Sequence, residues 1–256
     1  MKHGPAIWRS PVRQIRFDHG RHWRARLGFI ILAMEQTIEE DVFRLAPPGV
    51  GVHFSRIRMA NEITVETLEA SAKELSAAAA LILPNDNLSV VCFACTSSSF
   101  VIGEERVMRE LSSGVPGVRT TTLITGVVRA LRAFGARRLV VATPYLDEVN
   151  AIEADYLQGQ GFDVLDIQGL NIRNDSDMVR VEPNFIKQFA RTLDRPDADA
   201  LLVSCGALRT LDIVDVLEQE VGKPVVASNQ AMIWDTLRLA GIEDKIEGYG
   251  QLLRRY

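Results

Sequence analysis

Two stretches of sequence decide the fold: VVCFAC at residues 90–95 and ALLVSC at residues 200–205. Each is a short apolar run that ends in a cysteine, and small or hydroxyl-bearing residues follow that cysteine. Apolar runs of this length, bounded by turn-forming residues, are typical of buried strands. Because the same pattern with the same terminal cysteine occurs twice, we expect the chain to consist of two diverged copies of one unit.

Other landmarks recur in the same order around these two stretches. The paired segments are RLGFI 26–30 with RLVVA 138–142, GVP 114–116 with GKP 222–224, and LRAFG 131–135 with LRLAG 237–241. The spacing between the members of a pair changes only slightly along the chain, which chance does not easily produce four times. The repeat therefore predicts two similar lobes.

Strand-like runs alternate with helical patterns from Leu27 onward, as is typical of parallel sheets with helices on both faces. The expected strands are 27–33, 50–57, 90–94, 117–122, 138–142, 162–167, 200–204 and 224–227. The expected helices are 65–83, 99–111, 125–134, 148–160, 183–193, 210–221 and 230–240. The Asn- and Asp-rich stretch 171–181 is expected to be a long loop near a cleft, where ordered loops often carry function.

These patterns predict an α/β fold of two similar lobes related by a pseudo-twofold repeat, each a parallel sheet flanked by helices. We expect residues 27–125 plus 226–256 to form an N-terminal lobe and residues 126–225 a C-terminal lobe, after a separate arm at residues 1–26. The active site is expected in the cleft between the lobes.

Composition limits the possible functions. A chain of 256 residues with 47% hydrophobic residues can bury two cores. A net charge of −4 and a pI near 5.7 argue against a general nucleic-acid binder, and no apolar run reaches the roughly 20 residues that cross a bilayer. Three cysteines, an odd and sparse count without a Cys/His cluster, favour neither a disulfide scaffold nor a metal site. We therefore expect a soluble, cytoplasmic protein that acts on a small molecule, without nucleic-acid or membrane partners.

The arm at residues 1–26 is basic, with seven Lys or Arg residues against the single acid Asp18. It has neither a sustained period nor the apolar region of a secretory signal. A mobile or edge-packed tail is the expectation, with contact to a polyanion or a neighbouring subunit as the alternative.

The cysteines stand where open α/β sheets bind ligands, beyond the carboxyl ends of strands and at the start of the next helices. Helix N-termini stabilise thiolates and anionic ligands alike. Two facing thiols, Cys95 and Cys205, would supply the acid and base that proton transfer on two faces of one carbon requires. Cys92, within its strand, and His53 are expected to be structural.

The resemblance to a known family rests on five segments: ACTSSS 94–99, ATPYLDEVN 142–150, SCGALRT 204–210, PVVASNQA 224–231 and GYGQLL 248–253. They are similar to those of the aspartate/glutamate racemase superfamily, in the branch of maleate cis–trans isomerases and arylmalonate decarboxylases. The similarity runs from about Leu27 to the C-terminus.

This resemblance implies cofactor-independent chemistry, with no metal or nucleotide, at a carbon next to a carboxylate. By motif, Cys95 would be the nucleophile or base and Cys205 the opposing acid. The hydroxyls of Thr96, Ser97 and Tyr145, with the backbone N–H groups of Gly206 and Ala207, would hold the carboxylate or the enediolate that forms from it.

Two departures from the family pattern bear on the reaction. The decarboxylases have glycine at the position of Cys95, so a second thiol favours isomerisation or racemisation. Maleate isomerases show Ser-Asn-Thr in the first strand-to-helix loop, where this chain has Glu35 and Gln36. An ionised Glu35 would repel a substrate carboxylate by on the order of 1 kcal/mol or more, so an amine, amide or hydroxyl would fit better. Alternatively, Glu35 is a helix N-terminal acid that points to solvent.

One further residue, Asn229, is expected to line the cleft.

The sequence thus predicts a two-cysteine isomerase of a small carboxylic acid, similar to maleate cis–trans isomerases. Three alternatives stay open: a racemase of amino acids or N-substituted amino acids, an arylmalonate-type decarboxylase, and a non-catalytic carboxylate-binding protein. A resemblance to genes of ectoine utilisation is consistent with the first. A homo-oligomer, dimer or tetramer, is expected from the family.

Overall fold

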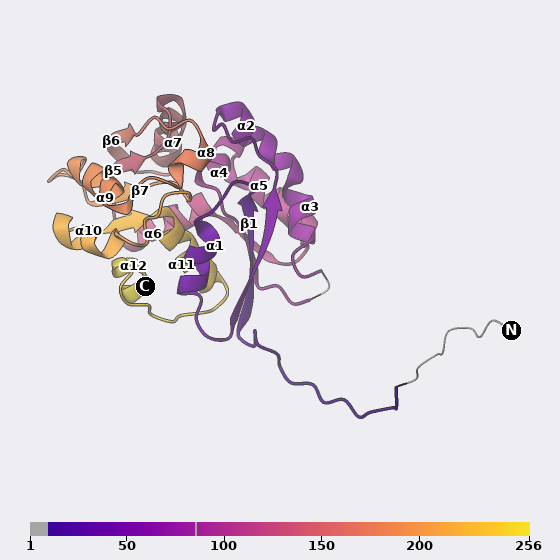
Figure 1. Cartoon of the computed structure of the whole chain (residues 1–256). Helices are drawn as coiled ribbons and strands as arrows, with labels where there is room; N and C mark the ends of the chain where they lie inside the picture. Colours follow the sequence, from indigo (N-terminus) through magenta and orange to yellow (C-terminus); the bar gives the residue numbers. More distant parts are fainter. Residues whose placement is uncertain (1–9, 85) are drawn as a thin grey trace.

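The computed structural model describes residues 10–84 and 86–256, and within them the two halves of the chain build the same kind of sheet (Figure 1). The strands are β1 (Ala25–Leu32), β2 (Val50–Ile57), β3 (Val90–Phe93), β4 (Arg119–Thr122), β5 (Arg138–Thr143), β6 (Asp163–Gly169), β7 (Ala200–Val203) and β8 (Val225–Ala227). They form two four-stranded sheets with the orders β2-β1-β3-β4 and β6-β5-β7-β8. All neighbouring strands are parallel. The predicted α/β fold and its internal repeat are confirmed.

All eight expected strands form, and most expected helices do as well. The helices are α1 (Ile38–Leu45), α2 (Val65–Ala70), the 3-10 turn η1 (Ser71–Glu74), α3 (Leu75–Ala80), α4 (Thr96–Ile102), α5 (Glu104–Gly114), α6 (Leu123–Ala133), α7 (Asp147–Gly159), α8 (Asp175–Met178), α9 (Pro183–Thr192), α10 (Val214–Val221), α11 (Ser228–Leu239) and α12 (Gly250–Arg255). The helix expected at 65–83 is broken by η1, and the one expected at 99–111 is broken at Gly103, whose φ is 90°.

Three short helices were not expected: α1, α8 and α12. Each has eight residues or fewer, which is too short for a helical period to stand out in the sequence. The stretch 171–181, expected to be a loop, is irregular except for α8.

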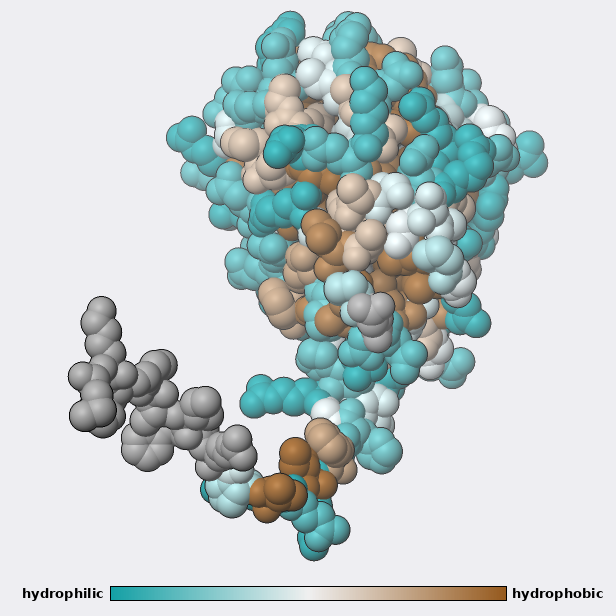
Figure 2. Space-filling view, turned by 90° about the vertical axis from the view of Figure 1, so that its right-hand side faces the viewer, coloured by the Kyte–Doolittle hydropathy of each residue, from teal (hydrophilic) through white to brown (hydrophobic). Residues whose placement is uncertain are grey.

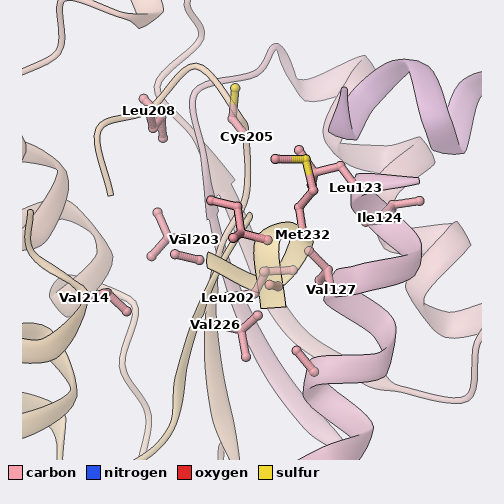
Figure 3. Packing of buried hydrophobic residues seen from close by; sticks show 14 of the residues in the cluster. Leu123, Ile124, Val127, Leu202, Val203, Cys205, Leu208, Val214, Val226 and Met232 are labelled. Atoms are coloured by element: carbon pink, nitrogen blue, oxygen red, sulfur yellow. The ribbon is translucent and has the colours of Figure 1, made fainter. Parts of the chain in front are cut away.

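The two halves share a core built around α6 and α11, the helices that follow β4 and β8. A Cβ atom on Gly126 of α6 would come within 2.9 Å of the Ala231 carbonyl oxygen of α11, so a side chain there would push these helices apart. Figure 3 shows Leu123 and Val127 of α6 beside Met232 of α11, with Leu202 and Val203 of β7 close by. The predicted lobe boundary at residue 226 falls inside β8, all of which pairs with β7.

The segment before β1 leaves the body of the molecule as an extended stretch (Figures 1 and 2). Val12, Ile15 and Phe17 on it are largely exposed, whereas the ring of His22 packs edge-on against that of His53 at 5.2 Å. From residue 10 onward the basic arm is therefore free of regular structure until it reaches β1; residues 1–9 lie outside the described part. No helix in the described residues is long and apolar enough to cross a membrane.

Candidate active site

The two thiols lie at the carboxyl ends of equivalent strands. Cys95 follows β3 and caps α4: the Ser98 N–H group donates to its Sγ at 3.5 Å, and the Ser97 hydroxyl lies 3.8 Å from the same atom. Cys205 follows β7, and the Ala207 N–H group donates to its Sγ at 3.4 Å. The backbone of Cys205 has a φ of 131°, which is strained for a residue with a side chain. Such strain is concentrated at functional sites, where the surrounding structure enforces it.

One buried hydroxyl joins the two thiol-bearing loops. Ser228, the first residue of α11, accepts a hydrogen bond from the Cys205 N–H group at 3.0 Å and another from the Thr96 hydroxyl at 3.3 Å. Thr96 directly follows Cys95 in the chain. The ends of β3 and β7 are thus fixed to each other through a single side chain.

Both thiols line one small pocket at this junction. Its lining residues are Leu32, Glu35, Ile63, Ala94, Cys95, Thr96, Ser97, Tyr145, Asp175, Met178, Cys205, Gly206 and Ala207. The volume open to the centre of a water-sized sphere is about 20 Å³, which is room for about one water molecule. A substrate of several heavy atoms exceeds this volume, so the side chains or loops that line the pocket must shift when it binds.

Burial in the pocket favours the protonated form of both thiols. Burial raises the pKa of Cys95, although hydrogen bonds from Ser98 and Ser97 partly offset this. Burial also raises the pKa of Cys205; the Tyr145 hydroxyl works against this rise, and the negative charge of Asp175 adds to it. The pKa of Tyr145 is itself raised well above its ordinary value by burial, so its hydroxyl keeps its proton. Burial thus disfavours a thiolate at either cysteine in the free protein.

Two buried carboxyl groups share the pocket with the thiols. Glu35, in the loop between β1 and α1, accepts hydrogen bonds from the backbone N–H groups of Gln36, Thr37 and Ile38. Burial raises its pKa to about 7, with these hydrogen bonds acting in the opposite direction. Burial raises the pKa of Asp175, at the start of α8, to about 6. The alternative in which Glu35 points to solvent is wrong, because only 6% of the residue is exposed.

Most of the site residues predicted from the sequence meet in this pocket. Eight do so: Glu35, Cys95, Thr96, Ser97, Tyr145, Cys205, Gly206 and Ala207. Gln36 does not, because it is exposed and its amide approaches the Met34 carbonyl. Asn229 is fully buried behind the pocket, where its amide donates to the Gly206 carbonyl and the Asp41 carboxyl group, both at 2.8 Å.

Sequence reasoning missed Asp175 and Ser228. Asp175 lies within 171–181, the stretch expected to carry function, but its side chain was not singled out there. Ser228 lies in the PVVASNQA segment used for the family resemblance, so the signal was its position directly after β8, the strand that pairs in parallel with β7. Cys92 is fully buried in β3, as expected of a core residue.

A comparison with known protein families identifies the family of this chain. A family model described as arylmalonate decarboxylase matches residues 50–253. The chain belongs to this family. Among its relatives, the arylmalonate decarboxylase of Bordetella bronchiseptica is 37% identical over 179 residues, which cover 66% of this chain and 73% of that protein. The maleate isomerase of Nocardia farcinica is 26% identical over 242 residues, 90% of this chain and 96% of that protein.

Solved structures from this family have the same architecture. A crystal structure of arylmalonate decarboxylase matches with a TM-score of 0.75 and 30% identity, covering 89% of this chain and 98% of that one. A mutant of the Nocardia farcinica maleate cis–trans isomerase with a covalently bound succinylcysteine intermediate matches with a TM-score of 0.83 over 91% of this chain and 99% of that one. At 24% identity, this second likeness concerns the fold. The predicted superfamily and branch are confirmed.

Proposed function

We propose that the protein is a cofactor-independent isomerase of a small carboxylic acid, of the maleate cis–trans isomerase type, with Cys95 and Cys205 as its two working thiols. The observation that carries this proposal is the position of the two thiols at the ends of β3 and β7, both lining one pocket. Relatives named maleate isomerases that match along almost their whole length support it. We also propose that the protein is a cytoplasmic homo-oligomer and that the substrate binds between the two lobes of each subunit.

The chemistry follows from two thiols on one substrate. Cys95 first loses its proton to solvent as the substrate binds. As the thiolate it adds to one carbon of a double bond beside the carboxylate and forms a C–S bond, while the Cys205 thiol gives a proton to the neighbouring carbon. The former double bond is then a single bond and can rotate. The Cys205 thiolate removes a proton from the same carbon, the double bond forms again, and Cys95 leaves as the thiolate. The cycle consumes no other reactant.

The rest of the pocket stabilises the charge that develops on the substrate carboxylate in this sequence. The hydroxyls of Thr96, Ser97 and Tyr145 line the pocket, and each can turn its proton toward an enediolate: Thr96 from Ser228, and Ser97 and Tyr145 from the two sulfur atoms. The backbone N–H group of Ala207, which donates to the Cys205 sulfur in the free protein, would stabilise that sulfur as a thiolate.

A racemase is the second candidate, because the same two thiols can remove an α-proton from one face of a carbon and return a proton to the other. Proton NMR in deuterium oxide separates the candidates on a panel of maleate, aryl- and alkylmalonates, and free or N-acylated amino acids. Fumarate from maleate supports the isomerase, and loss of an α-proton signal supports the racemase. Release of carbon dioxide from a malonate, surviving in Cys95→Ala, would make the protein a decarboxylase.

Single alanine variants test the assignment of the thiols. We expect Cys95→Ala and Cys205→Ala to lose isomerase turnover, while Cys92→Ala keeps it because Cys92 lies in the core. Full activity in either of the first two variants would refute the two-thiol mechanism. Ligand-induced thermal stabilisation of the wild type without any turnover would identify a carboxylate-binding protein instead.

A further inference from the structure

Among the described residues, two carboxyl groups and no positively charged side chain line the candidate pocket. Glu35 and Asp175 are the ionisable acids among the described residues that line it, and no Lys, Arg or His belongs to that lining. Neither carboxyl group takes part in an ion pair within the described part of the chain. The nearby guanidinium group of Arg56 bonds to the backbone carbonyl of Glu35 and pairs with Glu39 instead. A substrate with two carboxylates would meet no cation here.

Asp175 carries a buried acceptor that lacks a donor within the described part of the chain. The residue is 6% exposed and lines the pocket, and its Oδ2 atom has no hydrogen-bond partner among residues 10–84 and 86–256. Leaving a buried polar atom without a partner is costly, and more so when it is charged. A carboxyl oxygen of a pocket-lining residue that lacks a donor in the free protein can obtain one from a bound substrate.

The loop that carries Asp175 is fixed in position by the other half of the chain. The Asp175 N–H group donates to the Asn61 carbonyl at 2.9 Å, and the Ile63 N–H group donates to the Arg173 carbonyl at 2.9 Å. The Asn61 side chain accepts from the Ser176 N–H group at 3.1 Å. These contacts join the segments before α2 and before α8 at the pocket. The position of the Asp175 backbone beside the pocket is therefore set by hydrogen bonds to the first half of the chain.

Glu35 reinforces the negative character of this side of the pocket. Its Oε1 atom accepts hydrogen bonds from three consecutive N–H groups at the start of α1, but burial has the larger effect and raises the pKa to about 7, so Glu35 adds negative charge above that pH. The charge of Asp175 acts on Glu35 and on both thiols, so these four groups lie close enough to influence one another.

We infer that Asp175, assisted by Glu35, is a subsite for a protonated amine, and that the substrates are small carboxylic acids that also carry an ammonium group. This inference rests on the proposed function, because it takes the carboxylate to lie at the hydroxyls beside Cys95. The ammonium group would donate a charge-assisted hydrogen bond to the unpartnered Oδ2 of Asp175. It would also neutralise the charge that disfavours a thiolate at Cys95 and Cys205, so that the correct substrate promotes formation of its own nucleophile.

Two acids with the same carbon skeleton test this inference. Maleate has two carboxylates, whereas cis-4-aminobut-2-enoate replaces one of them with an ammonium-bearing methylene group. We would measure binding of each by calorimetry, and cis–trans conversion by NMR, at about pH 8, where both acids and the amine are ionised. The variants are Asp175→Asn, which keeps the shape but not the charge, and Asp177→Asn, a matched control on the exposed side of the same loop.

The wild type and Asp177→Asn should favour the amino acid over maleate, and Asp175→Asn should weaken binding of the amino acid by about 10- to 100-fold. Maleate binding should stay unchanged or improve in Asp175→Asn, because the repulsion is removed. Equal binding of both acids by the wild type, or unchanged binding of the amino acid by Asp175→Asn, would overturn the inference. Failure of the proposed function looks different: binding would show this selectivity, but neither acid would be converted in a thiol-dependent way.

Discussion

Replacing Glu153 by glutamine removes a carboxyl group that is completely buried beside the strand end carrying Cys205. Glu153, on α7, accepts a hydrogen bond from the hydroxyl of Ser204, and its second oxygen has no partner in the described structure. Burial raises its pKa from 4.5 to about 7, with the Ser204 hydrogen bond acting in the opposite direction. Glutamine has the same shape and cannot ionise.

The sign of the effect follows from the raised pKa. Between about pH 4.5 and pH 7 the folded protein holds a proton on Glu153 that the unfolded chain has released, so stability falls as the pH rises through this range. The shift corresponds to a loss on the order of 3 kcal/mol, complete above about pH 7. For a chain of this size, that is a decrease in melting temperature of about 10 °C.

Melting temperatures of the wild type and Glu153→Gln, measured from about pH 4 to pH 9, test this value. Other buried carboxyl groups, such as Glu35 and Asp175, contribute to the slope of both proteins, so the difference between the two curves isolates Glu153. We expect Glu153→Gln to lose less stability than the wild type as the pH rises. Glu148→Gln, an exposed change on the same helix, should follow the wild type. Parallel curves for the wild type and Glu153→Gln would refute the reasoning.

Two further predictions concern the loops that carry the thiols. In Ser228→Ala the Cys205 N–H group loses its acceptor. We expect the free energy of unfolding to fall by about 1–3 kcal/mol, measured by denaturant unfolding. Steady-state kinetics should show kcat lowered more than KM is changed. Alkylation by iodoacetamide, followed by mass spectrometry of the native protein, should become faster at Cys95 and Cys205 as the pH rises, because burial raises the pKa of both thiols. Cys92 should stay unmodified, since it is fully buried within β3.

Each of these two experiments has an outcome that would contradict the prediction. Unchanged kcat in Ser228→Ala would mean that the strand ends keep their positions without this hydroxyl. A labelling rate at Cys95 that is already maximal near neutral pH would mean that its thiolate is stable in the free protein.

Much of the fold could be predicted because it depends on local patterns. Buried strands are continuous apolar runs, and the duplication repeats them, so all eight strands and the positions of Cys95 and Cys205 at their ends follow from the sequence. The carboxyl ends of parallel strands meet at one edge, which is why residues following those strands, such as Thr96 and Gly206, belong to the pocket.

The sequence alone therefore determined the class of fold, the repeat and the pair of thiols, since each is a matter of residue type and spacing along the chain. Only the tertiary structure decided that Glu35 faces the pocket and Gln36 does not. The two residues are neighbours in a loop, and the backbone conformation of that loop directs one side chain inward and the next one outward. It alone brought Asp175 to the thiols, through hydrogen bonds with residues before α2 that are distant in the chain, and Ser228 between the two strand ends. Contacts at such separations depend on how the halves pack, which no local pattern of residues records.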